Sequence, residues 1–483
     1  MPSLPNNPNL DHFRQQAKTL LRAAKSGDER ALELIARPRS NAADPNPMTL
    51  TAAQFAVARG YGFSGWPQLE HYLNTAEVLR RDPTAGLPET DADPADAFCR
   101  LACLVYSEKD GPERWATARA VLNEHSDIVA HSIAAAATAA DPDALREHLA
   151  ADPRAANTET GPHRWAALMY LTYSRALRGD EPAERFLLSA RLLLDAGADP
   201  NAGYLWSGLT PPFTVLTGVF GEGEQGPGRQ PRHPHSLALA RLLLARGADP
   251  NDGQTLYNRM FRPDDSHLEL LFEFGLGRGD GGPWKRRLGE AAETPTEMLA
   301  RQLEWAIDHG LAARVDLLAG NGVDVRAPLA DGRSAAQRAA DGGRLDIAAI
   351  ITYHGGRAPV VNDSARLLDR LLTGGCGTNA HLGRDALAAC RSRWPDLIHR
   401  ATTPEAVQRV AEAGFDVDAR RDGATALHQA AWNGALTLVR ALLDAGADPD
   451  ARDDHFGATP LGWAEHGYQE PACRLLAADG PAQ

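Results

Sequence analysis

The first candidates for chemistry in this sequence are two glycine-rich stretches, GEGEQG at residues 221–226 and GRGDGG at residues 277–282. Both have the G-x-G-x-x-G spacing, which in dinucleotide-binding proteins follows a strand, opens a helix and lets the backbone approach a pyrophosphate. Neither stretch follows a predicted strand or opens a predicted helix, and both carry carboxylates where the pyrophosphate would lie. We therefore predict flexible loops at both positions.

A second candidate is a metal site on the loop that begins with the first of these stretches. His233 and His235 lie close in sequence to Glu222 and Glu224, and imidazole with carboxylate is an acceptable ligand set for zinc or iron. The proline between the histidines and the glycines around the glutamates define no coordination geometry, so a polar loop is the simpler interpretation. The sequence also contains no HExxH, P-loop or G-x-S-x-G motif and no recognisable catalytic triad. It thus predicts no metal, no cofactor and no catalytic residue.

Composition disfavours two classes of partner. The chain has 483 residues, 43% of them apolar, and a formal net charge of −13. Nucleic acids and anionic membranes both attract basic surfaces, so the acidic balance predicts binding to neither. The first residues, MPSLPNNPNLDHF, lack the charged and apolar regions of a secretory signal, which predicts a cytoplasmic protein. Frequent Ala, Arg, Gly and Pro are typical of GC-rich bacterial coding.

One phrase recurs along the chain, as LLLDAGADPN at 192–201, LLLARGADPN at 242–251 and LLDAGADPD at 442–450. Each copy reads as the last turns of a helix that stops at a glycine, where a left-handed residue ends the helix and a proline prevents its continuation. Asp-Pro-Asn then favours a turn. The phrase therefore marks the junction between successive helical units.

The third copy shows the whole unit, DGATALHQAAWNGALTLVRALLDAGADPDARD at 422–453. It contains a turn at Asp422-Gly423, a short helix from Thr425, a break at Asn433-Gly434 and a second helix. The next unit begins at Gly457, 34 residues after Gly423. A period of about 33 residues with two short helices and a turn is the ankyrin signature.

This part of the chain resembles the ankyrin-repeat family, of which the protein is identified as a degenerate bacterial member. The sequence TALH at 425–428 carries the resemblance together with the glycine stops. In that family Thr425 and His428 would hydrogen-bond the turn and the neighbouring backbone, so we expect a structural role for both. The usual proline after the threonine is replaced here by Ala426.

Weaker units are predicted over the rest of the chain. Further glycine stops fall at Gly275, Gly322, Gly355 and Gly414, and one more helical unit covers residues 385–401. We predict an all-α ankyrin solenoid of roughly ten to twelve units with short β-turn fingers, because each helical pair is too small to bury its own apolar face. The predicted boundaries are a capping region at 1–81, repeats at 97–276 with a loop insertion at 220–235, a linker at 277–296 and further repeats at 297–480.

Aromatic residues make up only 6% of the chain, and several of them gather in its middle. Some precede first helices, where ankyrin proteins form the fingers that line a concave binding surface; packing between units is the alternative role for these rings. Trp, Tyr and Arg are frequent anchors of protein interfaces. The predicted binding residues are His163, Trp165, Tyr204, Trp206, Tyr257, Arg259 and Trp432.

Two functions follow as hypotheses. The resemblance implies a non-enzymatic scaffold that binds a protein partner through its concave face, and the net charge predicts a partner with a basic surface. The alternative is a small-molecule-binding or catalytic protein that uses a pocket in the middle repeats, residues 163–261. The long insertion at 220–235 would then serve as a lid.

Overall fold

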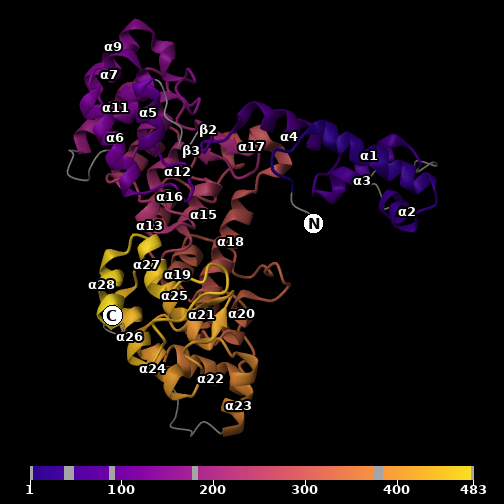
Figure 1. The fold of residues 1–483 in the computed structure, drawn as a ribbon. Coiled ribbons are helices and arrows are strands. Elements are labelled where there is room, and N and C mark those ends of the chain that lie inside the picture. The colour runs from indigo at the N-terminus through magenta and orange to yellow at the C-terminus, as the bar shows by residue number, and fades with distance from the viewer. Residues whose placement is uncertain (1–3, 37–47, 86–92, 177–182, 375–383, 480–483) are drawn as a thin grey trace. The chain divides into compact units, whose positions relative to one another are not determined.

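A computed structural model of the chain describes residues 4–36, 48–85, 93–176, 183–374 and 384–479. These residues are mostly helical, and the strands are short (Figure 1). The chain divides into two compact units, each built from three segments. Unit 1 comprises residues 1–221, 232–258 and 270–298, and unit 2 comprises residues 222–231, 259–269 and 299–483.

The elements of unit 1 are α1 (Leu10–Lys25), α2 (Glu29–Ala36), α3 (Leu50–Gly60), α4 (Trp66–Leu79), β1 (Arg80–Arg81), α5 (Pro94–Ala102), α6 (Pro112–Glu124), α7 (Ile128–His131), α8 (Ile133–Thr138), α9 (Pro142–Ala151), η1 (Pro153–Ala156), α10 (Ala167–Tyr173), α11 (Ala183–Asp195), β2 (Gly203–Trp206), β3 (Phe213–Thr214), α12 (Val215–Phe220), α14 (Ser236–Ala245), α17 (Gly282–Leu288) and η2 (Gly289–Ala291). Three helices have residues in both units, namely α15 (Gly253–Arg259), α16 (Ser266–Glu273) and α18 (Pro295–Asp308).

Helical pairs stack on one another in unit 1. α8 packs against α10 and α10 against α12, while α9 packs against α11 and α11 against α14. Before α12 the chain forms the antiparallel pair β2–β3, and β1 adds to β2 in parallel with Arg80 opposite Leu205. A finger of two short strands thus precedes a first helix, as the resemblance predicts.

The repeated phrase ties each pair to the next. In the first copy, the Asn201 side chain donates to the carbonyl of Gly247 at 2.9 Å and accepts from the backbone N–H of Asp249 at 2.8 Å. Asn251 of the second copy makes the equivalent bonds to the turn after α16, with the carbonyl of Arg278 and the N–H of Gly277. Asn157 makes them to the first copy, with the carbonyl of Gly197 and the N–H of Asp199. The asparagine therefore satisfies the backbone groups left free where the next helix ends.

The predicted linker at 277–296 is instead structured. It contains α17, which packs against α4, and the start of α18. Trp284 and Leu288 are buried in a core shared with Leu69 and Tyr72, and the Trp284 indole donates to the Asn201 carbonyl at 3.1 Å. Burial of these apolar side chains is the physical reason why the segment folds onto unit 1.

The buried carboxyl of Asp252 gives unit 1 a pH dependence. It accepts hydrogen bonds from the hydroxyls of Thr214 and Thr217 and from the backbone N–H of Thr255. Burial nevertheless raises the pKa of Asp252 to about 6, above the value of about 3.9 for an exposed aspartate. Between these values the unfolded chain releases a proton that the folded chain retains. The free energy of unfolding therefore falls by up to about 3 kcal/mol as the pH rises from about 4 to about 6.

We expect the substitution Asp252→Asn to flatten this part of the stability profile. The amide oxygen retains an acceptor for the threonine hydroxyls, while the titrating proton is removed. The measurement is the denaturant midpoint of both proteins at several pH values between 4 and 7. An equally steep profile in the variant would assign the pH dependence to another group.

The elements of unit 2 are α13 (Gly226–Arg229), α19 (Ala312–Gly320), α20 (Ala335–Asp341), α21 (Leu345–Tyr353), α22 (Asp363–Leu372), α23 (Arg384–Arg393), η3 (Leu397–Arg400), α24 (Pro404–Glu412), β4 (Arg420–Arg421), β5 (Ala424–Thr425), α25 (Ala426–Trp432), α26 (Leu436–Asp444), α27 (Pro460–His466) and α28 (Glu470–Asp479). The apolar sides of the elements from α22 to α28 form one core, which includes Leu368, Leu397, Val410, Leu427 and Leu476.

The repeat around Thr425 confirms the expected structural roles. The hydroxyl of Thr425 caps α25 by accepting from the backbone N–H of His428, and the His428 Nδ1 lies 2.8 Å from that hydroxyl. The other ring nitrogen of His428 lies 3.0 Å from the carbonyl of Ala458 in the next repeat. The predicted glycine stop at Gly446 has φ +91°, in the left-handed region.

Residues 222–231, which we call the strap, belong to unit 2 and are not a flexible loop. The strap closes on itself through a hydrogen bond from Glu222 N to Gln230 O at 2.6 Å. Arg229 donates to the carbonyl of His466 at 2.8 Å, and its guanidinium lies 5.1 Å from the ring centre of Tyr468. Gly228 faces the backbone of Gly467 so closely that a Cβ atom has no room. The strap therefore holds the last repeat.

A second segment of unit 2, residues 259–269, contacts two distant parts of the repeat array. Arg314 of α19 is buried and donates to the Met260 carbonyl at 2.8 Å and to the Asp265 carboxylate at 2.5 Å. Arg262 donates to the carbonyl of Asn433, just after α25, at 3.1 Å. Together with the strap, this segment links the first helices of unit 2 to the last ones.

Candidate functional site

Three of the predicted binding residues lie in the interior of unit 1. His163, Trp165 and Tyr204 are 5%, 2% and 2% exposed. The rings of His163 and Trp165 stack with centroids 4.4 Å apart, and Trp165 stacks on Tyr204 at 5.4 Å. Tyr170 and Tyr173 pack against the same indole. These aromatic residues thus form a packed cluster.

The cluster borders a cavity of about 400 Å³ in unit 1, lined by Trp165 and Tyr204 together with polar residues. Two arginines of the lining are already paired, Arg81 with Glu159 at 2.5 Å and Arg287 with Asp199 at 3.3 Å. Burial lowers the pKa of the neighbouring His163 to about 3, so this imidazole is neutral near pH 7. Trp165 and Tyr204 therefore line this cavity with aromatic rings, and the neighbouring His163 adds no charge.

The other four predicted residues are distributed over both units. Trp206 is half-buried at the end of β2, edge-on to Phe213, and Tyr257 is half-buried in α15. Arg259 is fully buried and forms ion pairs with Glu222 and Asp264. Trp432 is half-buried and stacks on His466 with centroids 5.8 Å apart. The seven residues thus do not share one set of contacts.

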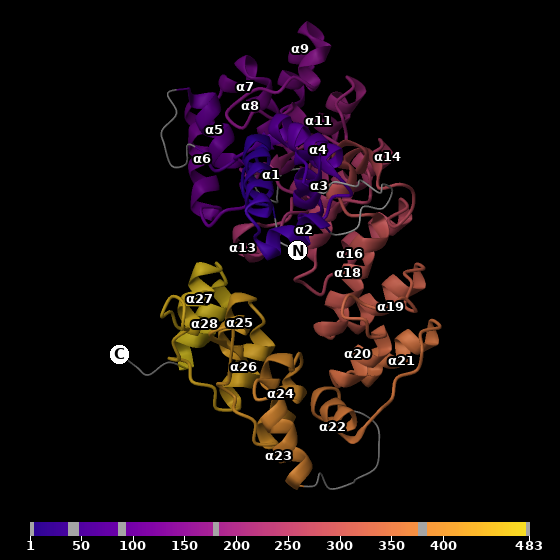
Figure 2. The same cartoon turned by 90° about the vertical axis from the view of Figure 1, so that its right-hand side faces the viewer.

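Unit 2 contains a larger pocket, of about 600 Å³, where one repeat lacks a full first helix. In this repeat the first helix is the four-residue turn η3, whereas α25 has seven residues. Pro395 precedes the turn, and a proline both lacks an N–H and disfavours helical geometry in the residue before it. Residues of α20, α22, α25 and α26 contribute to its lining, and Figure 2 shows the ribbons of α20 and α22 apart from those of α25 and α26.

The pocket lining is predominantly basic. Six arginines and two aspartates contribute to it, namely Arg333, Arg338, Arg344, Arg393, Arg400, Arg421, Asp308 and Asp341. Four of the arginines are held by carboxylates: Arg338 by Asp308 at 2.5 Å, Arg344 by Asp346 at 2.7 Å, Arg421 by Asp396 at 2.6 Å and Arg333 by Asp331 at 2.7 Å. Both lining aspartates are themselves paired with these arginines.

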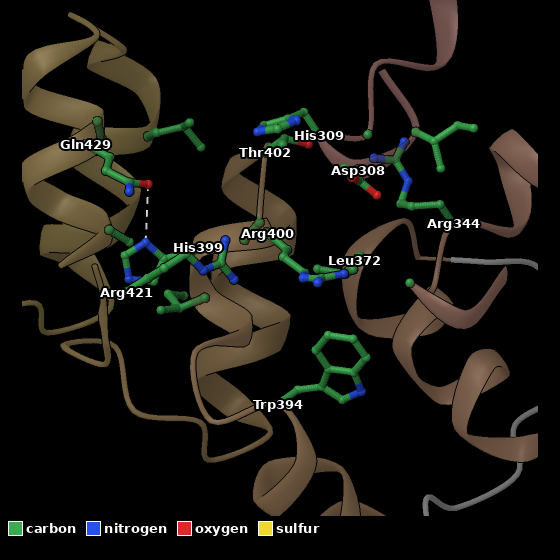
Figure 3. Close-up of a pocket in the computed structure, with 18 of the residues that line it drawn as sticks. Asp308, His309, Arg344, Leu372, Trp394, His399, Arg400, Thr402, Arg421 and Gln429 are labelled. Atoms are coloured by element: carbon green, nitrogen blue, oxygen red, sulfur yellow. Dashed lines mark hydrogen bonds between the residues drawn. The ribbon is translucent and has the colours of Figure 1, made fainter. Parts of the chain in front are cut away.

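Arg400 differs from those four arginines. In the described part of the chain no carboxylate forms an ion pair with it. Its guanidinium lies 4.3 Å from the ring centre of Trp394, and Figure 3 shows its side chain extending across the middle of the pocket. Burial lowers the pKa of Arg400, the charge of Arg421 lowers it further, and Asp396 and Asp308 oppose the shift. The centre of the pocket is therefore a partly desolvated cation.

This pocket was not predicted, because the sequence indicates only a further helical unit over residues 385–401. One signal was present in RSRWPDLIHR, where arginines and a tryptophan surround Pro395. A proline at the start of a first helix predicts that this helix is short. A short first helix leaves side chains of the adjacent repeats unpacked on that side. The pairing of the other arginines depends on tertiary contacts that have no short-range signal.

Among the described residues, no group of three or more His, Cys, Asp or Glu side chains is arranged to hold a metal ion. His233 is buried against Phe186, with ring centroids 4.6 Å apart. In the same described ranges, no helix combines the length and apolarity needed to cross a membrane.

Comparison with known proteins assigns a class to the C-terminal region. Residues 358–453 and 398–482 match the family model for ankyrin repeats, in three copies. The C-terminal region of the chain therefore consists of ankyrin repeats, and the pocket lies largely within it. Among individual proteins, the human mitochondrial disaggregase is similar, with 37% identity over 139 residues. The match covers 26% of this chain and 19% of the disaggregase, so the chain spans about a fifth of that relative's length.

Proposed function

We propose that this chain is a non-enzymatic interaction scaffold, in which the ankyrin repeats of unit 2 hold a partner protein at the pocket beside η3. Ankyrin repeats bind through surfaces formed by successive repeats, and their partners are proteins. The pocket is formed by residues of several repeats and includes inner-helix positions such as Gln429 and Asn433. This arrangement is the observation that carries the proposal.

The chemistry of the pocket also favours binding over catalysis. Its ionisable groups are mainly arginines, which remain charged at neutral pH and do not exchange protons there. Among the described residues, its lining also includes His309 and His399 and contains no cysteine, serine, tyrosine or lysine. We therefore propose that it recognises a partner through charge and shape.

Site-specific crosslinking tests the proposal. A photoreactive phenylalanine analogue placed at Gln429, in the pocket, is expected to capture a discrete partner protein in cells of the source organism. The same residue placed at Tyr353, which is 86% exposed and lies outside the pocket, is the matched control. We expect a crosslinked band at Gln429 that is absent at Tyr353, identified by mass spectrometry.

Identical bands from both positions would indicate random encounters and contradict the proposal. The absence of any protein adduct at Gln429, with efficient photoactivation, would also contradict it. Both variants carry the new group on a side chain that is not fully buried, so each is expected to retain the wild-type circular dichroism spectrum.

A further inference from the structure

The strongest unexplained feature of the pocket is the charge of Arg400. Two other arginines of the lining, Arg344 and Arg421, each have a carboxylate partner outside the pocket lining. Among the described residues, the Trp394 ring lies 4.3 Å from the Arg400 guanidinium, whereas Asp396 and Asp308 stabilise its charge without forming an ion pair. A ring face stabilises a cation but supplies none of the hydrogen-bond acceptors for which a guanidinium has five N–H donors.

This arrangement is unfavourable without a further group. A charge that is removed from water costs free energy unless it is paired and hydrogen-bonded. Here burial and the neighbouring Arg421 act against the charged form of Arg400, and Asp396 and Asp308 offset part of that effect. An incoming anion would oppose the repulsion from Arg421 and supply the hydrogen-bond acceptors that the guanidinium lacks.

The volume and the lining of the pocket indicate which kind of molecule carries the anion. The pocket has a volume of about 600 Å³, which is enough for a few amino-acid residues and much more than a single ion requires. Its walls combine apolar positions such as Leu372 and Leu438 with amides such as Gln429 and Asn433. Such a lining fits a peptide segment, with amides toward its backbone and apolar groups toward its side-chain stems.

We infer that the pocket of unit 2 binds an acidic peptide segment of the partner protein, and that Arg400 receives one of its carboxylates as a bidentate pair. This inference rests on the proposed function and specifies the chemistry of the partner. It reverses, for this surface, the expectation of a basic partner that the net charge suggested. A guanidinium matches a carboxylate through two parallel N–H···O bonds.

Peptide binding to the full-length protein tests the inference. The probe is a fluorescein-labelled, C-terminally amidated glutamate-rich peptide, compared with the same peptide in which glutamine replaces every glutamate. We expect the glutamate peptide to bind at least about tenfold more tightly, with an affinity that falls as salt is raised. Arg400→Gln should remove most of this preference, and Arg400→Lys should retain only part of it, because lysine lacks the planar fork.

The control variant is Arg357→Gln, which removes one exposed arginine of unit 2 outside the pocket lining and should leave the preference unchanged. Two further arms identify the source of the carboxylate. A glutamine peptide with a free C-terminus that binds as well as the amidated glutamate peptide would overturn the assignment to side-chain carboxylates. Displacement of the glutamate peptide by inorganic phosphate at equal molar concentration would overturn the peptide assignment.

The inference and the proposed function fail in distinguishable ways. If both peptides bind equally, or if Arg400→Gln leaves the preference intact in a protein with unchanged circular dichroism, the inference is wrong. The crosslink from Gln429 would then still stand, because it does not require Arg400. If the crosslink is absent, the proposed function fails whatever the peptides do.

Discussion

Replacing Trp165 by alanine is expected to lower the free energy of unfolding of unit 1 by about 3–5 kcal/mol. The indole is 2% exposed and contacts His163, Tyr170, Tyr173 and Tyr204. Its removal leaves a cavity among rings that cannot all move inward at once, so the cost exceeds that of the lost apolar area alone. The measurement is the denaturant midpoint followed by circular dichroism, because the substitution also removes a fluorophore.

Trp206→Ala provides the matched control for this prediction. Trp206 lies in the same unit and contacts Phe213, but it is half-buried. We expect a clearly smaller loss of stability, because part of its ring already faces water. Equal midpoints for Trp165→Ala and the wild type would show that the Trp165 ring is not packed and would return it to the candidates for ligand binding.

The substitution Gly228→Ala should detach the strap from the last repeat. A methyl group at this position overlaps the carbonyl oxygen of Gly467, which is a backbone atom and cannot rotate away. Overpacking of this kind typically costs about 1–3 kcal/mol. The bond from Arg229 to the His466 carbonyl would be lost with it. We expect amide hydrogen exchange in α27 and α28 to accelerate by about tenfold or more, whereas exchange in α10 and α12 of unit 1 stays unchanged.

Gly462→Ala separates this effect from a general loss of stability in the same repeat. Gly462 lies within α27, and a Cβ atom there would approach its nearest neighbour, the Ala458 Cβ, at 3.6 Å, an ordinary van der Waals separation. Alanine is also the better helix former, so exchange in α27 should be as slow as in the wild type or slower. Unchanged exchange in Gly228→Ala would mean that the strap does not stabilise the repeat.

The features that the sequence predicted are those encoded by short-range patterns. The glycine stops at Gly197, Gly247 and Gly446 all have positive φ, between +89° and +96°, because each ends a helix in the left-handed region. The cap formed by Thr425 and His428 follows from four consecutive residues. The asparagine bonds between copies of the phrase were not predicted, although the asparagine is part of the phrase itself.

The features that the sequence did not predict depend on contacts between distant segments. The strap reads as a flexible loop because its glycines and charges are typical of loops, and its partner at His466 lies 237 residues away. The predicted linker at 277–296 gave no sign that Trp284 reaches Asn201. For the pocket, Pro395 was a local signal, but the isolation of Arg400 depends on where every neighbouring carboxylate lies, and only the fold determines that.

The position of the strap in the chain has a consequence for the order in which the protein assembles during synthesis. The segments assigned to unit 1 end at residue 298, so unit 1 has all its parts before the ankyrin repeats exist. The strap is synthesised 237 residues before His466, which corresponds to roughly 12–50 s on the ribosome at about 5–20 residues per second. Throughout that interval the strap has no repeat to hold. A chain that stops anywhere between residues 298 and 466 therefore contains all the segments of unit 1. In unit 2 of such a chain, the strap lacks the repeat that it contacts in the complete protein.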